Sequence, residues 1–101
     1  MKVGAGNRAR YKFRLYVAGN APNSAQAIAN LAGLCREHLV DRHDVEIVDV
    51  FRHPQRALKD RIFMTPTLVK LAPQPAPKLI VGNLSQKAPL LLALELESVP
   101  E

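Results

Sequence analysis

The stretch Tyr16-Val17-Ala18-Gly19-Asn20-Ala21-Pro22-Asn23-Ser24 decides the fold, because an alternating strand pattern ends in it and a helical pattern begins. Gly19 and Asn20 suit a tight turn, and Pro22 suits the first turn of a helix. In an open α/β sheet, a ligand or partner usually docks at such a strand-to-helix turn. The turn contains no cysteine, histidine or acidic residue. It therefore predicts a surface that another protein grips rather than a reactive centre.

The two periodicities lie on either side of this turn. Before it, Phe13, Leu15 and Val17 alternate with polar or larger side chains, which predicts a strand. After it, Asn20 or Asn23 is expected to cap a helix. The apolar face of that helix is expected to comprise Ile28, Leu31, Ala32, Cys35 and Leu39.

A second strand and a second helix follow. The nearly continuous apolar run over residues 45–50 predicts a strand covered on both faces, as in a parallel sheet. Together with the preceding strand and helix it forms a βαβ unit, whose crossover is expected to be right-handed. Pro54 then opens a short helix that is expected to run to about Ile62, with Ala57, Leu58 and Ile62 on its apolar side.

The C-terminal part predicts a hairpin and a final helix. Residues 68–71 and 79–81 are expected to form consecutive antiparallel strands, joined by a stiff connection of spaced prolines. Residues 84–97 fit two templates. They are rich in helix formers from Ser85 or Ala88 onwards, yet Leu92, Leu94 and Leu96 alternate as they would in a strand. We expect a helix there.

The composition indicates one compact domain. The chain has 101 residues and a net charge of +5. Residues 1–10 are expected to form a flexible basic tail, and residues 11–101 the domain. Basic residues elsewhere are interleaved with acidic ones, without stacking aromatics, which favours a solvated surface or an acidic protein partner over nucleic acid. No signal peptide or membrane-spanning run is visible, so we expect a soluble cytoplasmic protein.

The residues that usually carry chemistry are few. Cys35 is the only cysteine, which excludes a CxxC pair, and its place on an apolar face favours a buried small hydrophobe. His38, His43 and His53 are too scattered for a metal site. No nucleophile elbow or phosphate loop is present. We therefore expect no catalytic residue, metal or cofactor.

Several motifs in register resemble the KaiB circadian-clock family. They are Leu15–Ser24, Val48–Val50, His53–Gln55, Met64–Leu68, the spaced prolines and Gly82–Ser85, and the resemblance runs from about Lys12 to Glu97. It implies a thioredoxin-like βαβαββα single domain. The alternative is the tetrameric ground-state fold of that family, βαββααβ, with a rearranged C-terminal half. Pro66 resembles the cis-proline turn of thioredoxins.

The resemblance also implies a function. Family members in the thioredoxin-like state bind the N-terminal ATPase ring of KaiC, displace a sensor histidine kinase domain and recruit KaiA. They also self-associate as dimers or tetramers. The implied function is a non-enzymatic regulatory binding module that is gated by fold switching. Gln55 and Arg61 align with positions of KaiC contact, and Arg14 and Gln26 with positions of suspected KaiA contact. An ordinary solvated surface is the alternative interpretation of all four residues.

The chain departs from the family pattern in the segment that would switch fold. Ala93 stands where the family is expected to have glycine, which favours helix by roughly 1 kcal/mol. Pro89 is expected to shorten the final helix. The chain is therefore expected to be a divergent member with a more populated thioredoxin-like form. A thioredoxin-like stress protein and a chaperone-like protein without a clock role remain the alternative functions.

Overall fold

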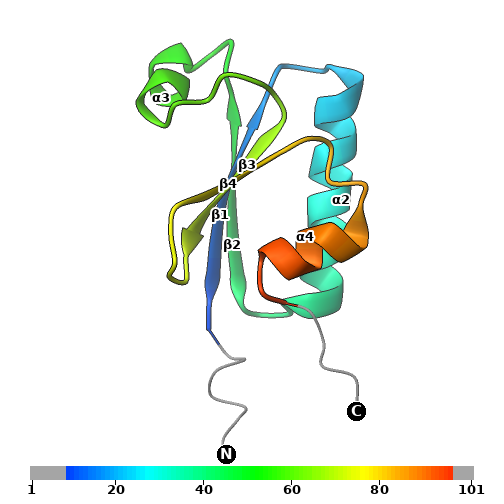
Figure 1. The fold of residues 1–101 in the computed structure, drawn as a ribbon. Coiled ribbons are helices and arrows are strands. Elements are labelled where there is room, and N and C mark those ends of the chain that lie inside the picture. The colour runs from blue at the N-terminus through cyan, green and yellow to red at the C-terminus, as the bar shows by residue number, and fades with distance from the viewer. Residues whose placement is uncertain (1–8, 97–101) are drawn as a thin grey trace, which may run out of the picture.

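A computed structural model describes residues 9–96 of the chain. Its elements follow the order βαβαββα, which confirms the predicted thioredoxin-like order (Figure 1). Their bounds are β1 Tyr11–Val17, α2 Pro22–His38, β2 His43–Asp49, α3 Pro54–Lys59, β3 Thr67–Ala72, β4 Lys78–Val81 and α4 Lys87–Ala93. The predicted basic tail, apart from its last two residues, lies outside the described residues, as do residues 97–101.

The four strands form one mixed sheet in the order β2-β1-β3-β4. The inner strand β1 pairs with β2 in parallel and with β3 antiparallel. Strands β3 and β4 form the predicted antiparallel hairpin. Side chains alternate between the two faces of a strand, so the inner strand β1 contributes residues to both hydrophobic cores of the domain.

The helices divide between the two faces of the sheet. Helices α2 and α4 cover one face, whereas α3 covers one end of the other face (Figure 1). Phe13 and Leu15 of β1 are buried in the core that includes side chains of α2 and α4. Tyr16, which points the opposite way, is buried with Val48 of β2 and Ala57 of α3. The face of the sheet that carries α3 is therefore covered by less helix than the opposite face.

Strand β2 differs from the expectation of a strand covered on both faces. It is an edge strand, and Val45 and Ile47 are 39% and 44% exposed while Val48 is only 1% exposed. Ile28 and Ala32 of α2, which line a shallow hollow together with Val45 and Ile47, are exposed as well. Helix α2 lies over the inner strands, so the apolar run of β2 is only partly covered on that side.

Helix α2 buries a slightly different face from the one expected. Its buried residues are Ser24, Ala27, Leu31, Leu34 and Cys35. The predicted burial of Cys35 is confirmed, but Ala21 is the N-cap and no side chain caps the helix. The prediction of an asparagine cap is therefore wrong. The hydroxyl of Ser24, one turn into the helix, instead accepts a hydrogen bond from the Ala18 amide at 3.0 Å.

Helix α3 ends at Lys59, earlier than expected, in a Schellman motif. Arg61 adopts a φ of 60°, its amide donates to the Leu58 carbonyl, and the Ile62 amide donates to the Ala57 carbonyl at 2.8 Å. Ile62 then packs in the same cluster as Ala57. The apolar contact that accompanies this motif explains why Ile62 is buried although it lies beyond the helix.

Helix α4 ends in the same way. Glu95 adopts a φ of 61°, its amide donates to the Leu92 carbonyl, and the Leu96 amide donates to the Leu91 carbonyl at 2.8 Å. Pro89 is the third residue of this helix, where a missing amide proton costs no intrahelical hydrogen bond. Both helices thus place a charged residue at a left-handed position that favours glycine.

Candidate functional site

The turn between β1 and α2 is held by hydrogen bonds and contains no reactive side chain. Gly19 has a φ of 53°, and a Cβ atom there would lie 3.4 Å from the ring of Phe51. The Asp49 carboxylate accepts hydrogen bonds from the amides of Gly19 and Phe51 at 3.1 and 3.0 Å. This carboxylate ties together the ends of β1 and β2. Pro22 is the first residue of α2, as expected, and Asn20 is exposed.

The segment before β3 lies beside this turn, because Thr67 pairs with Tyr16 across the sheet. The Thr65–Pro66 peptide bond is cis, the isomer that the sequence led us to expect. The Thr67 hydroxyl donates to the Met64 carbonyl at 2.6 Å, and the Gly82 amide donates to the Pro66 carbonyl at 2.9 Å. Pro66 is buried. These contacts fix the backbone on both sides of the proline.

The thiol of Cys35 is remote from the turn in sequence and is buried on α2. Burial raises its pKa to about 11, so the reactive thiolate is scarce at neutral pH. Among residues 9–96, no group of three His, Cys, Asp or Glu side chains is placed to hold a metal ion. Within the same part of the chain, none of the helices has both the length and the apolar character needed to cross a bilayer.

An ion-pair network links the sheet to α3. The Tyr16 hydroxyl donates to Asp60 Oδ2 at 2.5 Å, and Arg14 donates to both Asp60 and Glu46 at 2.9 Å. Arg56 on α3 completes the network by donating to Glu46 at 2.8 Å. The hydrogen bonds from Arg56 and Arg14 lower the pKa of Glu46 to about 2. Burial, together with the bond to Asp60, raises the pKa of Tyr16 to about 12.

The residues expected to contact partners fall on opposite sides of the sheet. Gln55 on α3 and Arg61 just after it are both exposed. Arg14 points to the α3 side, but its guanidinium is engaged in the network described above. Gln26 is exposed on α2, where it accepts a hydrogen bond from Asn83 at 2.8 Å. Gln55 and Arg61 therefore lie in one exposed segment around α3, whereas Gln26 lies on α2.

Large apolar side chains surround Gln55 and Arg61 in the sequence and are exposed. Phe51, Leu58, Phe63 and Met64 are 74%, 71%, 85% and 62% exposed. We call these four residues, together with Gln55 and Arg61, the α3 surface. Exposed apolar patches often mark sites of protein interaction, and these four residues lie close together in the sequence.

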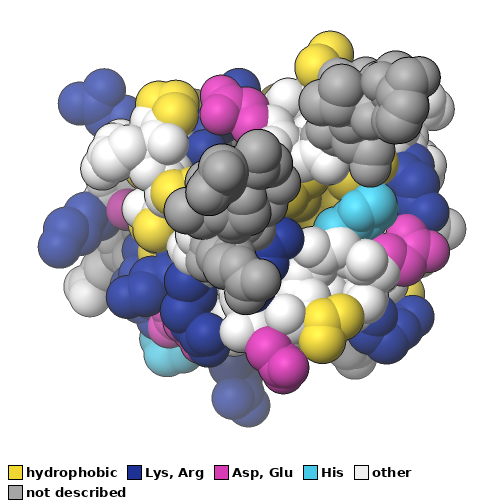
Figure 2. Space-filling model, turned by 90° about the horizontal axis from the view of Figure 1, so that it is seen from below, with side chains coloured by type: hydrophobic (Ala, Val, Ile, Leu, Met, Phe, Trp, Pro, Cys, Tyr) yellow, Lys and Arg dark blue, Asp and Glu magenta, His cyan; other side chains and the backbone are white. Residues whose placement is uncertain are grey.

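Sequence reasoning missed most of this apolar set, since it placed Leu58 on the inner side of α3. Ile62 is buried whereas the adjacent Phe63 and Met64 are exposed, and no periodicity in the sequence distinguishes the three residues. At the opposite end of the domain, Lys and Arg side chains are interspersed with Asp and Glu (Figure 2). That end therefore presents no uniform charge, whereas the α3 surface has a distinct apolar character.

Comparison with known proteins agrees with this arrangement. The KaiB domain family matches residues 14–96. The circadian clock protein KaiB3 of Synechocystis sp. is 46% identical over 92 residues, which cover 91% of this chain and 87% of that protein. The circadian clock oscillator protein KaiB of Microcystis aeruginosa is 41% identical over 86 residues, or 85% of this chain and 82% of that protein.

Solved structures of other proteins share the fold of this domain. The N-terminal domain of Synechococcus elongatus SasA superposes with a TM-score of 0.69 at 18% identity, covering 92% of this chain and 90% of that domain. Thioredoxin of Fasciola hepatica gives a TM-score of 0.69 at 15% identity, covering 92% and 86%. The domain has a thioredoxin-like fold, and by its sequence the chain belongs to the KaiB family of circadian clock proteins.

Proposed function

We propose that the protein is a non-enzymatic regulatory module that docks through the α3 surface onto the N-terminal ATPase ring of a KaiC-like protein. The exposure of Phe51, Leu58, Phe63 and Met64 is the observation that carries this proposal. Aromatic and Met side chains are enriched in the cores of protein interfaces. Gln55 and Arg61 provide hydrogen-bond donors around this apolar set.

The comparisons support the same partner class. The relatives are clock proteins, and the SasA domain shares the architecture of this chain. Two domains of one architecture can present similar backbone frameworks to one ring, which would make their binding mutually exclusive. Displacement of such a thioredoxin-like domain is the regulatory output that we propose. A KaiA-like partner would then use a different surface, such as the one that carries Gln26.

Gating by fold switching is the second part of the proposal, and α4 supplies the support for it. As a helix, residues 87–93 bury Leu90 and, just beyond the helix, Leu94, but they leave Leu92 62% exposed. A strand would instead place Leu92, Leu94 and Leu96 on one face. The left-handed conformation of Glu95 further weakens the helical arrangement. A few kcal/mol is enough to exchange two such packings.

The docking test is size-exclusion chromatography with the KaiC homologue of the same cell. We expect a shifted peak at tens of micromolar protein, and no shift would contradict the proposal. Phe63→Ser and Arg61→Gly should each weaken binding at least about tenfold. Arg61→Gly is informative because glycine suits the left-handed position, so the fold is retained. Val40→Ser, a change at an exposed apolar residue between α2 and β2, is the matched control and should bind normally.

The gating test follows the formation of the complex over time in the same mixture. If only the thioredoxin-like state binds, the population of that state limits the apparent affinity. Ala93→Gly lowers helix propensity by roughly 1 kcal/mol and should slow or weaken complex formation. Backbone NMR shifts of residues 84–96 report helix or strand directly. Identical binding kinetics and identical shifts for Ala93→Gly and the parent protein would contradict gating while leaving docking intact.

A further inference from the structure

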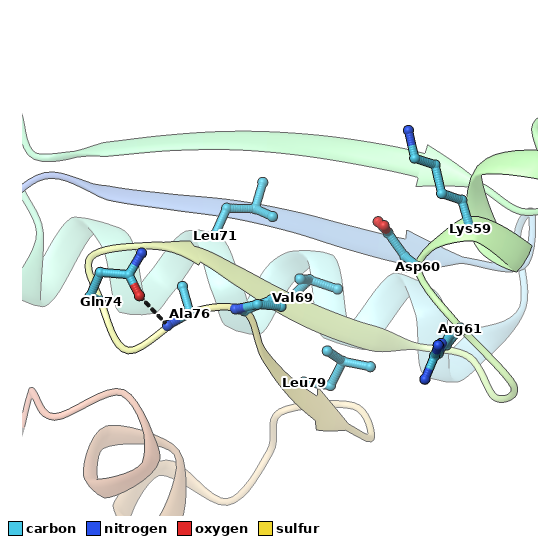
Figure 3. A pocket seen from close by; sticks show the side chains of 9 residues that line it. Lys59, Asp60, Arg61, Val69, Leu71, Gln74, Ala76 and Leu79 are labelled. Atoms are coloured by element: carbon cyan, nitrogen blue, oxygen red, sulfur yellow. Dashed lines mark hydrogen bonds between the residues drawn. The ribbon is translucent and has the colours of Figure 1, made fainter.

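A hollow of about 630 Å³ lies on the side of the sheet that α3 leaves open. Its apolar floor is formed by Val69 and Leu71 of β3 and Leu79 of β4. Figure 3 shows the end of α3 at one end of this floor and the β3–β4 connection at the other. The volume lies within the range of small-molecule sites, about 300–1,000 Å³. We call this hollow the α3–β4 groove.

The floor is suited to an apolar body because it is only partly covered. Val69 is 2% exposed and forms the base of the floor, whereas Leu79 is 43% exposed. Strand β4 is an edge strand, and no other strand pairs with its free side among the described residues. An apolar chain laid along Leu71 and Leu79 would remove both side chains from water, and such burial is favourable in proportion to its area.

The charges at the α3 end leave a net positive rim. Lys59 and Arg61 line the groove, and no ion pair joins either of them to another residue of the described chain. Asp60, which lies between them, is already engaged by Tyr16 and Arg14 on the sheet side. Those hydrogen bonds keep the pKa of Asp60 below its usual range, so its negative charge is balanced within the network.

The opposite end carries an oriented amide. The side-chain oxygen of Gln74 accepts a hydrogen bond from the Ala76 amide at 3.0 Å, as the dashed line in Figure 3 shows. This bond fixes the amide plane and leaves the NH₂ group of Gln74 as a donor. The groove is thus lined by two cations, an amide side chain and an apolar floor.

From this combination we infer that the α3–β4 groove is a binding site for a small amphipathic anion, such as a medium-chain carboxylate. The carboxylate accepts hydrogen bonds from Lys59 and Arg61, and the hydrocarbon chain lies on Leu71 and Leu79. Charge-assisted hydrogen bonds are stronger than neutral ones, and guanidinium matches the planar carboxylate geometry. The site requires no partner protein, but it shares Arg61 with the α3 surface, so the anion and the proposed partner would compete for this residue.

The test uses decanoate below the concentration at which it forms micelles. Titration into the ¹⁵N-labelled protein should give saturable amide shifts at Leu71, Gln74, Ala76 and Leu79. Decyltrimethylammonium, which has the same chain and the opposite charge, should bind at least about tenfold more weakly, because the cationic rim repels it. Equal binding of the two amphiphiles, or shifts confined to other surfaces, would overturn the inference.

Two matched variants locate the site. Leu79→Asp places a negative charge in the floor and should abolish saturable binding of decanoate. Val81→Asp makes the same change on the same strand and face at a residue that is 55% exposed and does not line the groove, so it should bind normally. A combined Lys59→Gln and Arg61→Gly change should weaken decanoate binding about tenfold. Equal effects of Leu79→Asp and Val81→Asp would exclude this site.

Discussion

The hydroxyl of Tyr11 donates a buried 2.9 Å hydrogen bond to the carbonyl of Leu94, so the first residue of β1 holds the end of α4. Residues 83 positions apart in the chain are thereby joined. The Leu94 carbonyl belongs to the last turn of the helix, where carbonyl groups lack intrahelical partners. This bond satisfies one of them inside the core.

Tyr11→Phe should therefore loosen α4 selectively. Losing the donor leaves a buried carbonyl unsatisfied, which costs about 1–2 kcal/mol. Hydrogen exchange of the amides of residues 90–96 should accelerate more than exchange in α2. The control is Tyr11→Leu, which also removes the ring packing against Phe13 and should destabilise the whole domain. Uniform acceleration across α2 and α4 in Tyr11→Phe would contradict a local role.

The left-handed residue Glu95 provides a stabilising substitution. Glu95→Gly should stabilise the thioredoxin-like fold by about 1 kcal/mol, because glycine adopts a φ of 61° without steric cost. Urea denaturation measures the change. Glu95→Ala, which removes the same charge but keeps a Cβ atom at this φ, is the charge-matched control and should give no such gain. If Glu95→Gly lowered the urea midpoint, the strain argument would be wrong.

Acid should weaken the network between the sheet and α3. The folded-state pKa of Glu46, about 2, lies below its ordinary value of 4.5. Its stabilising contribution is therefore present above pH 4.5 and is lost as the pH falls towards 2. The contribution is small because the side chain is 46% exposed and screened by solvent.

Urea midpoints at neutral and acid pH measure this effect. Glu46→Gln should lower the midpoint at neutral pH and flatten its fall in acid. Asp41→Asn removes a carboxylate that forms no ion pair with another described residue, and it should leave the profile unchanged. The prediction fails if both variants follow the parent profile.

The Cys35 thiol should react only when the chain opens. Burial to 2% exposure and a pKa of about 11 protect it, so labelling with a disulfide reagent at pH 8 should be slow in the native protein. In concentrated urea the rate should approach that of free glutathione. Rapid labelling of the native protein would contradict the buried placement. As the only thiol, Cys35 should also support no dithiol turnover of insulin, which tests the thioredoxin-like stress alternative.

Replacing Gly19 and Gly33 with alanine should change the stability of the domain in opposite directions. Gly19→Ala forces a Cβ atom into a left-handed residue that faces Phe51 and should destabilise the domain by about 1–2 kcal/mol. Gly33→Ala lies inside α2, where a Cβ atom would meet only the flexible end of Arg36 at 3.7 Å. It should stabilise the domain by up to about 1 kcal/mol. Chemical denaturation of both variants checks the difference in sign.

The order of elements could be predicted because the periodicities on the two sides of Gly19 are distinct. Exposure was harder to predict. The apolar run that contains Val45 and Ile47 indicates a strand but not its position in the sheet, and the structure places it at an edge. Helix α3 is too short for its pattern to fix which face is inward, so Leu58 was assigned to the wrong side.

The candidate site was only partly predictable for a related reason. Gln55 and Arg61 came from the resemblance to a family, and the structure places both in one exposed segment. Phe63 and Met64 follow no periodicity, so sequence patterns gave no measure of their exposure. The α3–β4 groove depends on how far α3 extends over the sheet, which is a tertiary property.

The bond between Tyr11 and Leu94 also fixes the geometry of attachment. It brings the start of β1 and the end of α4 to one pole, and α3 lies at the other (Figure 1). The described part of the chain therefore begins and ends near the pole opposite α3, and a fluorescent fusion or an immobilisation handle would continue from there. Attachment at either end should therefore leave the pole that carries α3 accessible in single-molecule and surface-based binding experiments.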